Sequence, residues 1–409
     1  MEAAFGWTLL SADAIRRAEA RLREEVEGVR DEVGFMLLHQ AYADRFFPGT
    51  SVQHTRLRYV FFVPWMYQKI AGFDLRRRRQ YSIEKLVAEE EVRLTGRLLL
   101  KESEGVIGRR VYGQRRPSSQ PATLVYWTAL STWGLLRRLE DGSWPSRRAI
   151  HQMLSTDWGQ VRIHDDDGVL IEEGHSIFSN IPSPPDVWKD QSKPLAFRLR
   201  ACEAQFIKSQ LLTTRKPHSP TPALLAEISK NPREAQDAKS PWQKNIIGVA
   251  DAEDRAALQR AKQAAALAAI GRAIYAALVE DLREKRDGLH TSMYHRSQLP
   301  KVVEDYRENA LELDLSILHQ DVPRVPAYFA AVLQKTQEWL KNGRGIDELR
   351  ETYERSEKFR KGDRARLVLR PVGRQKRAEW DNEKHPPAKP LHYRWPIVRQ
   401  MMADLEGHA

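Results

Sequence analysis

An alanine-rich run in the second half of the chain limits the fold more than any other feature. Between Asp251 and Asp287 alanine recurs throughout, and alanine has the highest helix propensity of the amino acids. The sequence therefore predicts one long helix here, with small side chains that allow other helices to pack closely. Lys262, Gln263 and Arg272 interrupt its most apolar part, so the run is typical of a packed helix and not of a membrane span.

Further helices are predicted from capping residues and apolar periodicity. Their ranges are Ser11–Val26, Val33–Phe47, Ser82–Leu100, Ala122–Arg138, Ser146–Trp158, Pro300–Leu318, Pro326–Lys341 and Ile346–Arg360. Pro64 lies in an aromatic stretch, 51–70, where it begins or kinks a helix of the predicted core. The sequence shows no repeat of fixed period, which disfavours a solenoid. The predicted fold class is mainly α, a multi-domain helical protein with minor β hairpins.

A helix pair followed by a hairpin suggests a winged-helix-like element. Asp141-Gly142 separates the two helices, and 161–171 contains an Asp-Asp-Asp-Gly turn. Two short helices and a hairpin also occur in folds that never bind DNA. The predicted domains are an N-terminal helical domain (1–104), a winged-helix-like domain (105–180), a Pro-rich irregular or linker region (181–250) and a C-terminal helical domain with a basic segment (251–409).

The positive net charge favours polyanionic partners. Lysine and arginine number 66 against 55 acidic residues, a formal charge of +11. Such a charge attracts nucleic acid or an anionic surface, although many basic proteins bind neither. The single cysteine, Cys202, excludes an internal disulfide and is predicted to be buried as a small hydrophobe. The N-terminus lacks the features of a signal peptide, so we expect a cytoplasmic protein without membrane contact.

No complete catalytic motif is present in the sequence. It has no phosphate-binding loop with Lys and Ser or Thr, no dinucleotide-binding glycine pattern and no His-x-Lys pair of phospholipase-D-like nucleases. We therefore expect no cofactor, and the absence of a complete motif favours a protein without catalytic activity. The alternative is a metal-dependent nuclease whose site assembles from residues such as Asp165, Glu172 and His175, although an acidic turn of this kind is usually only solvated.

Arginine-rich segments are the best candidates for a binding surface, because cationic side chains bind phosphates and neighbouring aromatic rings stack on bases. The densest segment is Lys358–Arg377, followed by Trp380, and its alternation from Arg364 to Arg370 predicts a strand. A solvated basic loop is the alternative. Four tryptophans are assigned to the core instead: Trp127, Trp133, Trp144 and Trp158. The predicted nucleic-acid-binding residues are Arg56, Arg58, Arg109, Arg110, Arg115, Arg116, Arg147, Arg148, Arg364, Arg366, Arg374, Lys376 and Arg377.

Short motifs near both ends of the chain resemble a bacterial protein family of unknown function. They are Phe46-Phe47-Pro48-Gly49-Thr50-Ser51, Thr55-Arg56-x-Arg58-Tyr59, Phe62-Val63-Pro64-Trp65, Gly108-Arg109, Tyr126-Trp127-Thr128-Ala129-Leu130, and the C-terminal Tyr393-Arg394-Trp395-Pro396 with Asp404-Leu405. Members of that family look like components of antiphage defence islands, encoded near helicases and phospholipase-D-like nucleases. The resemblance implies a DNA-related accessory role and identifies no catalytic residue.

The residues and the resemblance together predict a non-catalytic component of a bacterial antiphage defence system. It would bind DNA or dock a nucleic-acid enzyme, such as a helicase or nuclease of the same system. The metal-dependent nuclease and a structural scaffold with protein partners only remain as alternatives. Arg56 and Arg58 stand in an apolar stretch, where they are either structural ion-pair residues or an anion site.

Overall fold

The fold is mainly helical, as the sequence predicts. A computed structural model of the chain describes residues 32–156, 163–164, 170–172, 177–343, 345–381, 385 and 387–407. Helices make up nearly all regular structure in these residues, and one sheet pairs β1 (Ile163–His164) with β2 (Leu170–Glu172). The two strands are antiparallel, which confirms the hairpin predicted at 161–171. The predicted helix Ser11–Val26 lies outside the described residues.

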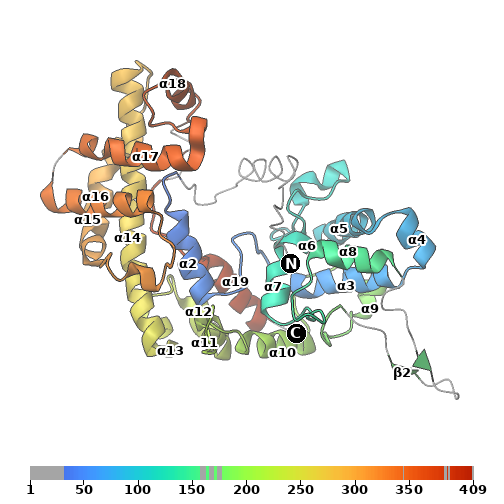
Figure 1. The fold of residues 1–409 in the computed structure, drawn as a ribbon. Helices are drawn as coiled ribbons and strands as arrows, with labels where there is room; N and C mark the ends of the chain where they lie inside the picture. Colours follow the sequence, from blue (N-terminus) through green and yellow to red (C-terminus); the bar gives the residue numbers. More distant parts are fainter. Residues whose placement is uncertain are drawn as a thin grey trace, which may run out of the picture.

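The alanine-rich run forms α14 (Ala252–Asp281), the long central helix of one lobe (Figure 1). Its N-cap is Asp251, whose side chain accepts a hydrogen bond from the Asp254 backbone N at 2.8 Å. Small side chains let neighbouring segments approach the helix closely, and a Cβ atom on Gly271 would overlap the ring of Phe35. A π-helical turn, Leu282–Arg286, follows directly. The predicted long helix is therefore confirmed.

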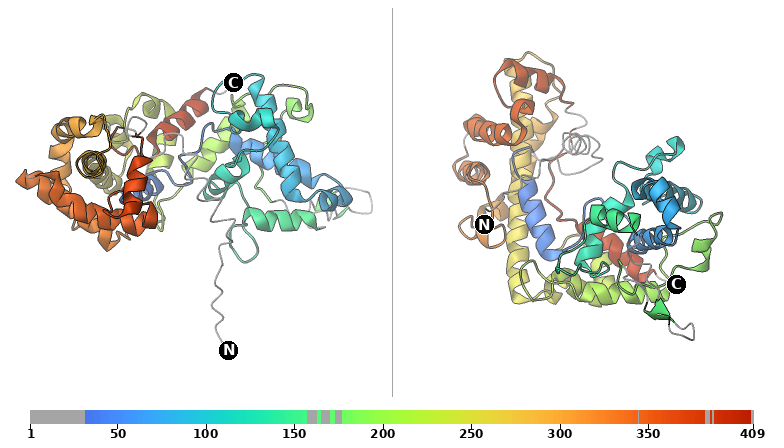
Figure 2. Two further views of the ribbon diagram at one scale, coloured as in Figure 1. Left: turned by 90° about the horizontal axis from the view of Figure 1, so that it is seen from above. Right: turned by 45° about the vertical axis from the view of Figure 1, so that its right-hand side comes forward.

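Four helices pack around α14 and complete this lobe. They are α15 (Tyr294–Glu312), α16 (Ala327–Asn342), α17 (Arg350–Lys361) and α18 (Pro371–Ala378). The view from above shows α14 end-on with the other helices arranged around it (Figure 2, left). The helices predicted at 326–341 and 346–360 are found as α16 and α17. α15 begins earlier than predicted, so Pro300 lies inside the helix.

A second lobe is built on α3 (Tyr59–Ala71) and α5 (Ile83–Leu99), on the right in Figure 1. α3 is buried along nearly its whole length and includes Pro64. α5 begins after Ser82, whose hydroxyl accepts a hydrogen bond from the Lys85 backbone N at 3.3 Å. α4 (Leu75–Gln80) and α8 (Arg147–Ser155) both pack on α5. The predicted helix starts at Ser82 and Ser146 are thus confirmed.

The single helix predicted over Ala122–Arg138 is wrong. The chain forms two short helices instead, α6 (Ala122–Val125) and α7 (Trp127–Thr132). They meet at Tyr126, whose hydroxyl donates to the Arg56 carbonyl at 2.8 Å and accepts from the Thr55 backbone N at 2.9 Å. Gly134 then turns the chain at a φ of +73°, and Leu136 pairs with Phe178 in a β-bridge. These contacts with distant residues override the helical periodicity.

The Pro-rich region 181–250 is not irregular, because much of it forms helices. It contains α9 (Asp186–Lys189), α10 (Ala201–Leu212), α11 (Leu224–Lys230), α12 (Pro232–Asp237) and α13 (Lys244–Val249). α10 to α13 run beneath the molecule from one lobe to the other (Figure 1). Pro185 is the N-cap of α9 and Pro232 is the first residue of α12, positions where a missing backbone donor is tolerated. The prolines therefore begin helices here.

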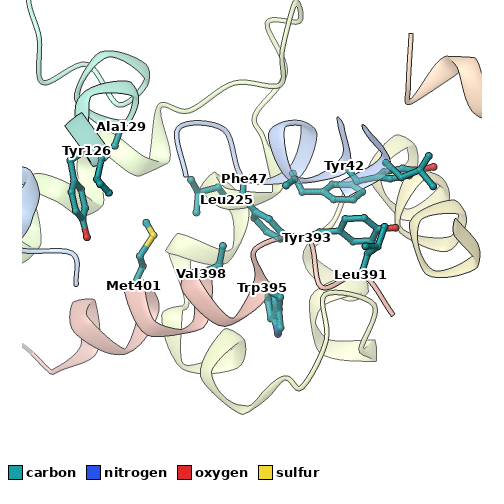
Figure 3. Packing of buried hydrophobic residues seen from close by; sticks show 14 of the residues in the cluster. Tyr42, Phe47, Tyr126, Ala129, Leu225, Leu391, Tyr393, Trp395, Val398 and Met401 are labelled. Carbon is teal, nitrogen blue, oxygen red and sulfur yellow. The ribbon is translucent and has the colours of Figure 1, made fainter. Parts of the chain in front are cut away.

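The two ends of the described chain meet between the lobes. α2 (Met36–Phe46) and its following turn pack against α19 (Trp395–Glu406), with Phe47 and Trp395 facing each other (Figure 3). The Arg394 guanidinium donates to the Thr50 carbonyl at 2.8 Å and to Asp44 at 2.7 Å. The N-terminal motif that contains Gly49 and the C-terminal motif that contains Trp395 are therefore parts of one packed unit.

Candidate nucleic-acid interface

Residues 105–120, which join α5 to α6, carry four of the predicted arginines, and we call them the arginine loop. The loop contains a 3-10 helix, η1 (Arg109–Gln114). Gly105 and Gly108 adopt φ values of +73° and +86°, a region that glycine reaches without strain. Because of these two turns, the chain leaves the end of α5 and folds back over the helix, which it contacts through η1.

Side chains of the core fix the arginine loop on α5. The Ile107 backbone N donates to the Tyr59 hydroxyl at 2.9 Å, and the Thr95 hydroxyl donates to the Ile107 carbonyl at 2.9 Å. Tyr112 lies against Gly96 so closely that a Cβ atom there would overlap its hydroxyl. The loop is therefore held in a defined conformation, which lowers the entropy lost when it binds a ligand.

All four arginines of the loop are exposed: Arg109, Arg110, Arg115 and Arg116. Two of them bond neutral acceptors, Arg109 the Ser103 carbonyl and Arg116 the Gln114 side chain. Within the described part of the chain, none of the four pairs with a carboxylate. Tyr112 stands between the two arginine pairs in the sequence and is 39% exposed. The loop therefore presents uncompensated positive charge beside an aromatic ring.

A small cavity of about 10 Å³ lies under the loop, lined by Tyr59, Glu91, Ile107 and Ser118 among others. Burial raises the pKa of Glu91 to about 7, and the hydrogen bond from the Thr123 backbone N, 2.8 Å long, offsets only part of that rise. This hydrogen bond joins Glu91 on α5 to Thr123 at the start of α6. Glu91 is therefore a structural residue beneath the basic surface.

The second predicted pair, Arg147 and Arg148, lies at the first turn of α8. Arg148 is exposed and has no carboxylate partner among the described residues, whereas Arg147 is half-buried. The pKa of the nearby Glu84 is lowered first by its hydrogen bond with His151, and the charge of Arg147 adds to that effect. Just before α8, the guanidinium of Arg138 stacks 4.1 Å from the ring centre of Trp144. Trp144 is 38% exposed, so its assignment to the core is wrong, while Trp133 is fully buried as predicted.

The strand predicted over Arg364–Arg370 is not formed. The segment is a 3-10 turn (Gly362–Arg364) followed by irregular chain and then α18. The carboxylate of Glu357 explains this course, because it accepts hydrogen bonds from the backbone N atoms of Arg366 and Leu367, both at 2.9 Å. These donors are turned inward to Glu357 and are not available for pairing with a strand.

Only part of the C-terminal basic segment reaches the surface. Arg364 and Arg374 are exposed, and Lys376 pairs with Glu379 at 2.7 Å. Arg366 binds the Glu32 carboxylate at 3.2 Å. Arg377 is fully buried, and its guanidinium donates to both oxygens of Asp287, at 2.6 and 2.9 Å, and to the Val368 carbonyl at 2.8 Å. Arg377 is therefore a packing residue with no free donor at the surface.

Arg56 and Arg58 are structural ion-pair residues. Arg58 is 6% exposed and donates to Glu203 at 2.9 Å and to the Ala196 carbonyl at 2.8 Å. Arg56 contacts both oxygens of Asp404: Nε and Nη2 lie 2.9 and 2.8 Å from Oδ1, and Nε also donates to Oδ2 at 3.2 Å. The carboxylates come from α10 and α19, so the two arginines hold these helices on the N-terminal lobe.

The predicted arginines do not gather on one surface. The arginine loop and the first turn of α8 belong to the lobe built on α5, whereas α17 and α18 belong to the lobe around α14 (Figure 1). Tyr112 and the arginines of α4 were not among the predicted residues, although both stand in short runs of cationic residues. Cys202 is exposed on α10, which corrects the expectation that it is buried.

A family model described as a family of unknown function (DUF6361) matches residues 4–312. The chain belongs to this family. The matched residues include the arginine loop and the N-terminal motifs, and they end before Tyr393. No curated protein and no solved structure matches the chain.

The described residues offer no metal centre, since no three histidine, cysteine or acidic side chains among them could share an ion. Of the alternative nuclease residues, Asp165 and His175 lie outside the described residues, and the structure describes no side chain for Glu172. Every helix in the described ranges is too short or too polar to span a membrane.

Proposed function

We propose that this protein binds DNA through the arginine loop, as a non-catalytic component. The observation that carries the proposal is the contrast between two classes of arginine. Arg58 and Arg377 are buried against carboxylates, whereas Arg109, Arg110, Arg115 and Arg116 are exposed and none of them pairs with a carboxylate in the described structure. Exposed guanidinium groups without a carboxylate are free to bind phosphate in bidentate geometry.

Two further features support the proposal. Tyr112 offers a ring beside the arginines, suited to contact with a sugar or an unstacked base. Arg148 adds an exposed cation on α8, which packs on the same helix, α5. The resemblance of the motifs to proteins of antiphage defence islands supports an accessory role inside the bacterial cell, beside a helicase or nuclease. The winged-helix-like arrangement of α8 and the hairpin stays a prediction.

The test is DNA binding by a loop variant in which Arg109, Arg110, Arg115 and Arg116 are all alanine. Fluorescence anisotropy with a labelled duplex at low salt should give a loss of at least tenfold in affinity, because each phosphate contact contributes to the release of counterions. A matched control removes four exposed cations from the other lobe that have no carboxylate partner in the described structure: Lys301, Arg324, Lys341 and Lys358. Both variants have the same net charge, so a difference between them isolates the position of the charges.

The proposal fails if the two variants lose affinity equally, since binding would then follow total charge. A wild-type protein that binds no DNA or RNA at low salt would favour a scaffold with protein partners only.

A further inference from the structure

A second basic surface in the same lobe forms an open cleft between α4 and the first turns of α5. The cleft has a volume of about 610 Å³ and is lined by Asp74, Arg76, Arg77, Gln80, Tyr81, Leu86 and Glu89. This volume is in the range of pockets that hold small organic ligands. The cleft combines cations, an aromatic ring and carboxylates, and the predicted site residues include none of these seven.

The arginine at the centre of α4 orients the others toward solvent. Arg78 is 1% exposed, and its guanidinium donates to the Leu154 carbonyl at 2.6 Å and to the Phe73 carbonyl at 3.0 Å. With Arg78 anchored on α8, Arg76 and Arg77 face outward into the cleft, and neither pairs with a carboxylate in the described part of the chain. Arg77 stacks 4.0 Å from the ring centre of Phe73, which limits its freedom.

The cleft also contains hydrogen-bond acceptors, Glu89 on α5 and Asp74 at the start of α4. Glu89 is 42% exposed at its side chain and forms an ion pair with Arg93 at 3.6 Å, a distance too long for a hydrogen bond. Asp74 uses one oxygen to accept the Arg77 backbone N at 2.8 Å. Tyr81 follows α4 in the sequence and precedes Glu89, and it is 42% exposed. The Nζ atom of Lys85 lies 5.4 Å from the centre of its ring.

We propose that this cleft binds one unpaired nucleotide of a nucleic-acid strand and reads its base. The phosphate binds Arg76 and Arg77, the base stacks on Tyr81, and Glu89 accepts a hydrogen bond from an exocyclic amino group. The negative charge of Glu89 disfavours a lone phosphate in this cleft, whereas cytosine N4 is a donor from which Glu89 can accept a hydrogen bond. Thymine offers a carbonyl at the same position, so the cleft prefers cytosine. This inference rests on the proposed function.

The test compares labelled oligo(dC) and oligo(dT) of equal length by fluorescence anisotropy at pH 7.5. The wild-type protein should bind oligo(dC) at least about fivefold more tightly, the lower end of what one base contact provides. Glu89→Gln should abolish this preference and raise the affinity for both strands, because an amide can donate to the thymine carbonyl and carries no charge. Tyr81→Ala should weaken oligo(dC) binding at least about fivefold, and Tyr81→Phe should not. Glu338→Gln, on the other lobe, is the matched control for charge.

Equal affinity of the wild-type protein for the two strands would overturn the inference, and so would a preference that survives in Glu89→Gln. Because the arginine loop is unchanged in these variants, duplex binding reports separately on the proposed function. Duplex binding that depends on the loop, without a preference among single strands, would contradict this inference alone. Absence of binding to any DNA would contradict both.

Discussion

Replacement of the buried Arg377 should destabilise the lobe around α14 without a direct effect on DNA binding. In Arg377→Leu, the carboxylate of Asp287 loses two hydrogen bonds of 2.6 and 2.9 Å, and the Val368 carbonyl loses one of 2.8 Å. Asp287 is 9% exposed, so water barely reaches the carboxyl group that has lost these two bonds. Breaking a buried ion pair on one side costs about 3–5 kcal/mol, a large part of the roughly 5–15 kcal/mol that holds a domain folded.

Urea unfolding followed by circular dichroism measures this loss. The control is Arg364→Ala, an exposed arginine of the same basic segment, which should change the free energy of unfolding by less than about 0.5 kcal/mol. The double variant Arg377→Leu with Asp287→Leu should recover part of the loss, because no unpaired charge remains. The reasoning would be refuted if Arg377→Leu unfolded like the wild type, or if it lost DNA affinity while its stability was unchanged.

Two further predictions concern stability. Gly49→Ala should lower the free energy of unfolding, measured with urea, by about 2 kcal/mol or more. Gly49 has a φ of +80°, and a Cβ atom there would lie 2.5 Å from Trp133 Nε1. A change below about 0.5 kcal/mol would contradict this prediction. Burial raises the pKa of Glu91 in the folded protein from 4.5 to about 7, so folding favours the protonated carboxyl group. The wild type therefore loses about 3 kcal/mol of folding free energy as the pH rises from 4.5 through 7. Glu91→Gln should therefore match the wild type at pH 5 and be more stable at pH 8, and parallel pH profiles would exclude this explanation.

Local signals in the sequence identified the helices well. Asp251, Ser82 and Ser146 each cap a helix through a side-chain hydrogen bond to a backbone N three residues later, and such a cap depends on neighbouring residues alone. The alanine-rich run is similarly explicit, because propensity summed over many residues favours one conformation.

The sequence could not show which arginines are free. Arg58 meets Glu203 across 145 positions, and Arg377 meets Asp287 across 90, so their burial depends on tertiary contacts that no local pattern encodes. The same limit explains the strand wrongly predicted at Arg364–Arg370, where Glu357 takes the backbone donors. The Pro-rich region was wrongly predicted to be irregular because proline is as common in the first turn of a helix as in irregular segments.

The most direct test of the central claim is the salt dependence of duplex binding by the wild type and the variant with alanine at Arg109, Arg110, Arg115 and Arg116. The slope of log K against log salt changes by about 0.9 for each phosphate contact in B-DNA. If all four arginines bind phosphates, the slope of the variant should be shallower by about 3–4, and that of the matched control on the other lobe should stay close to the wild type. Identical slopes for the wild type and the loop variant would contradict the account.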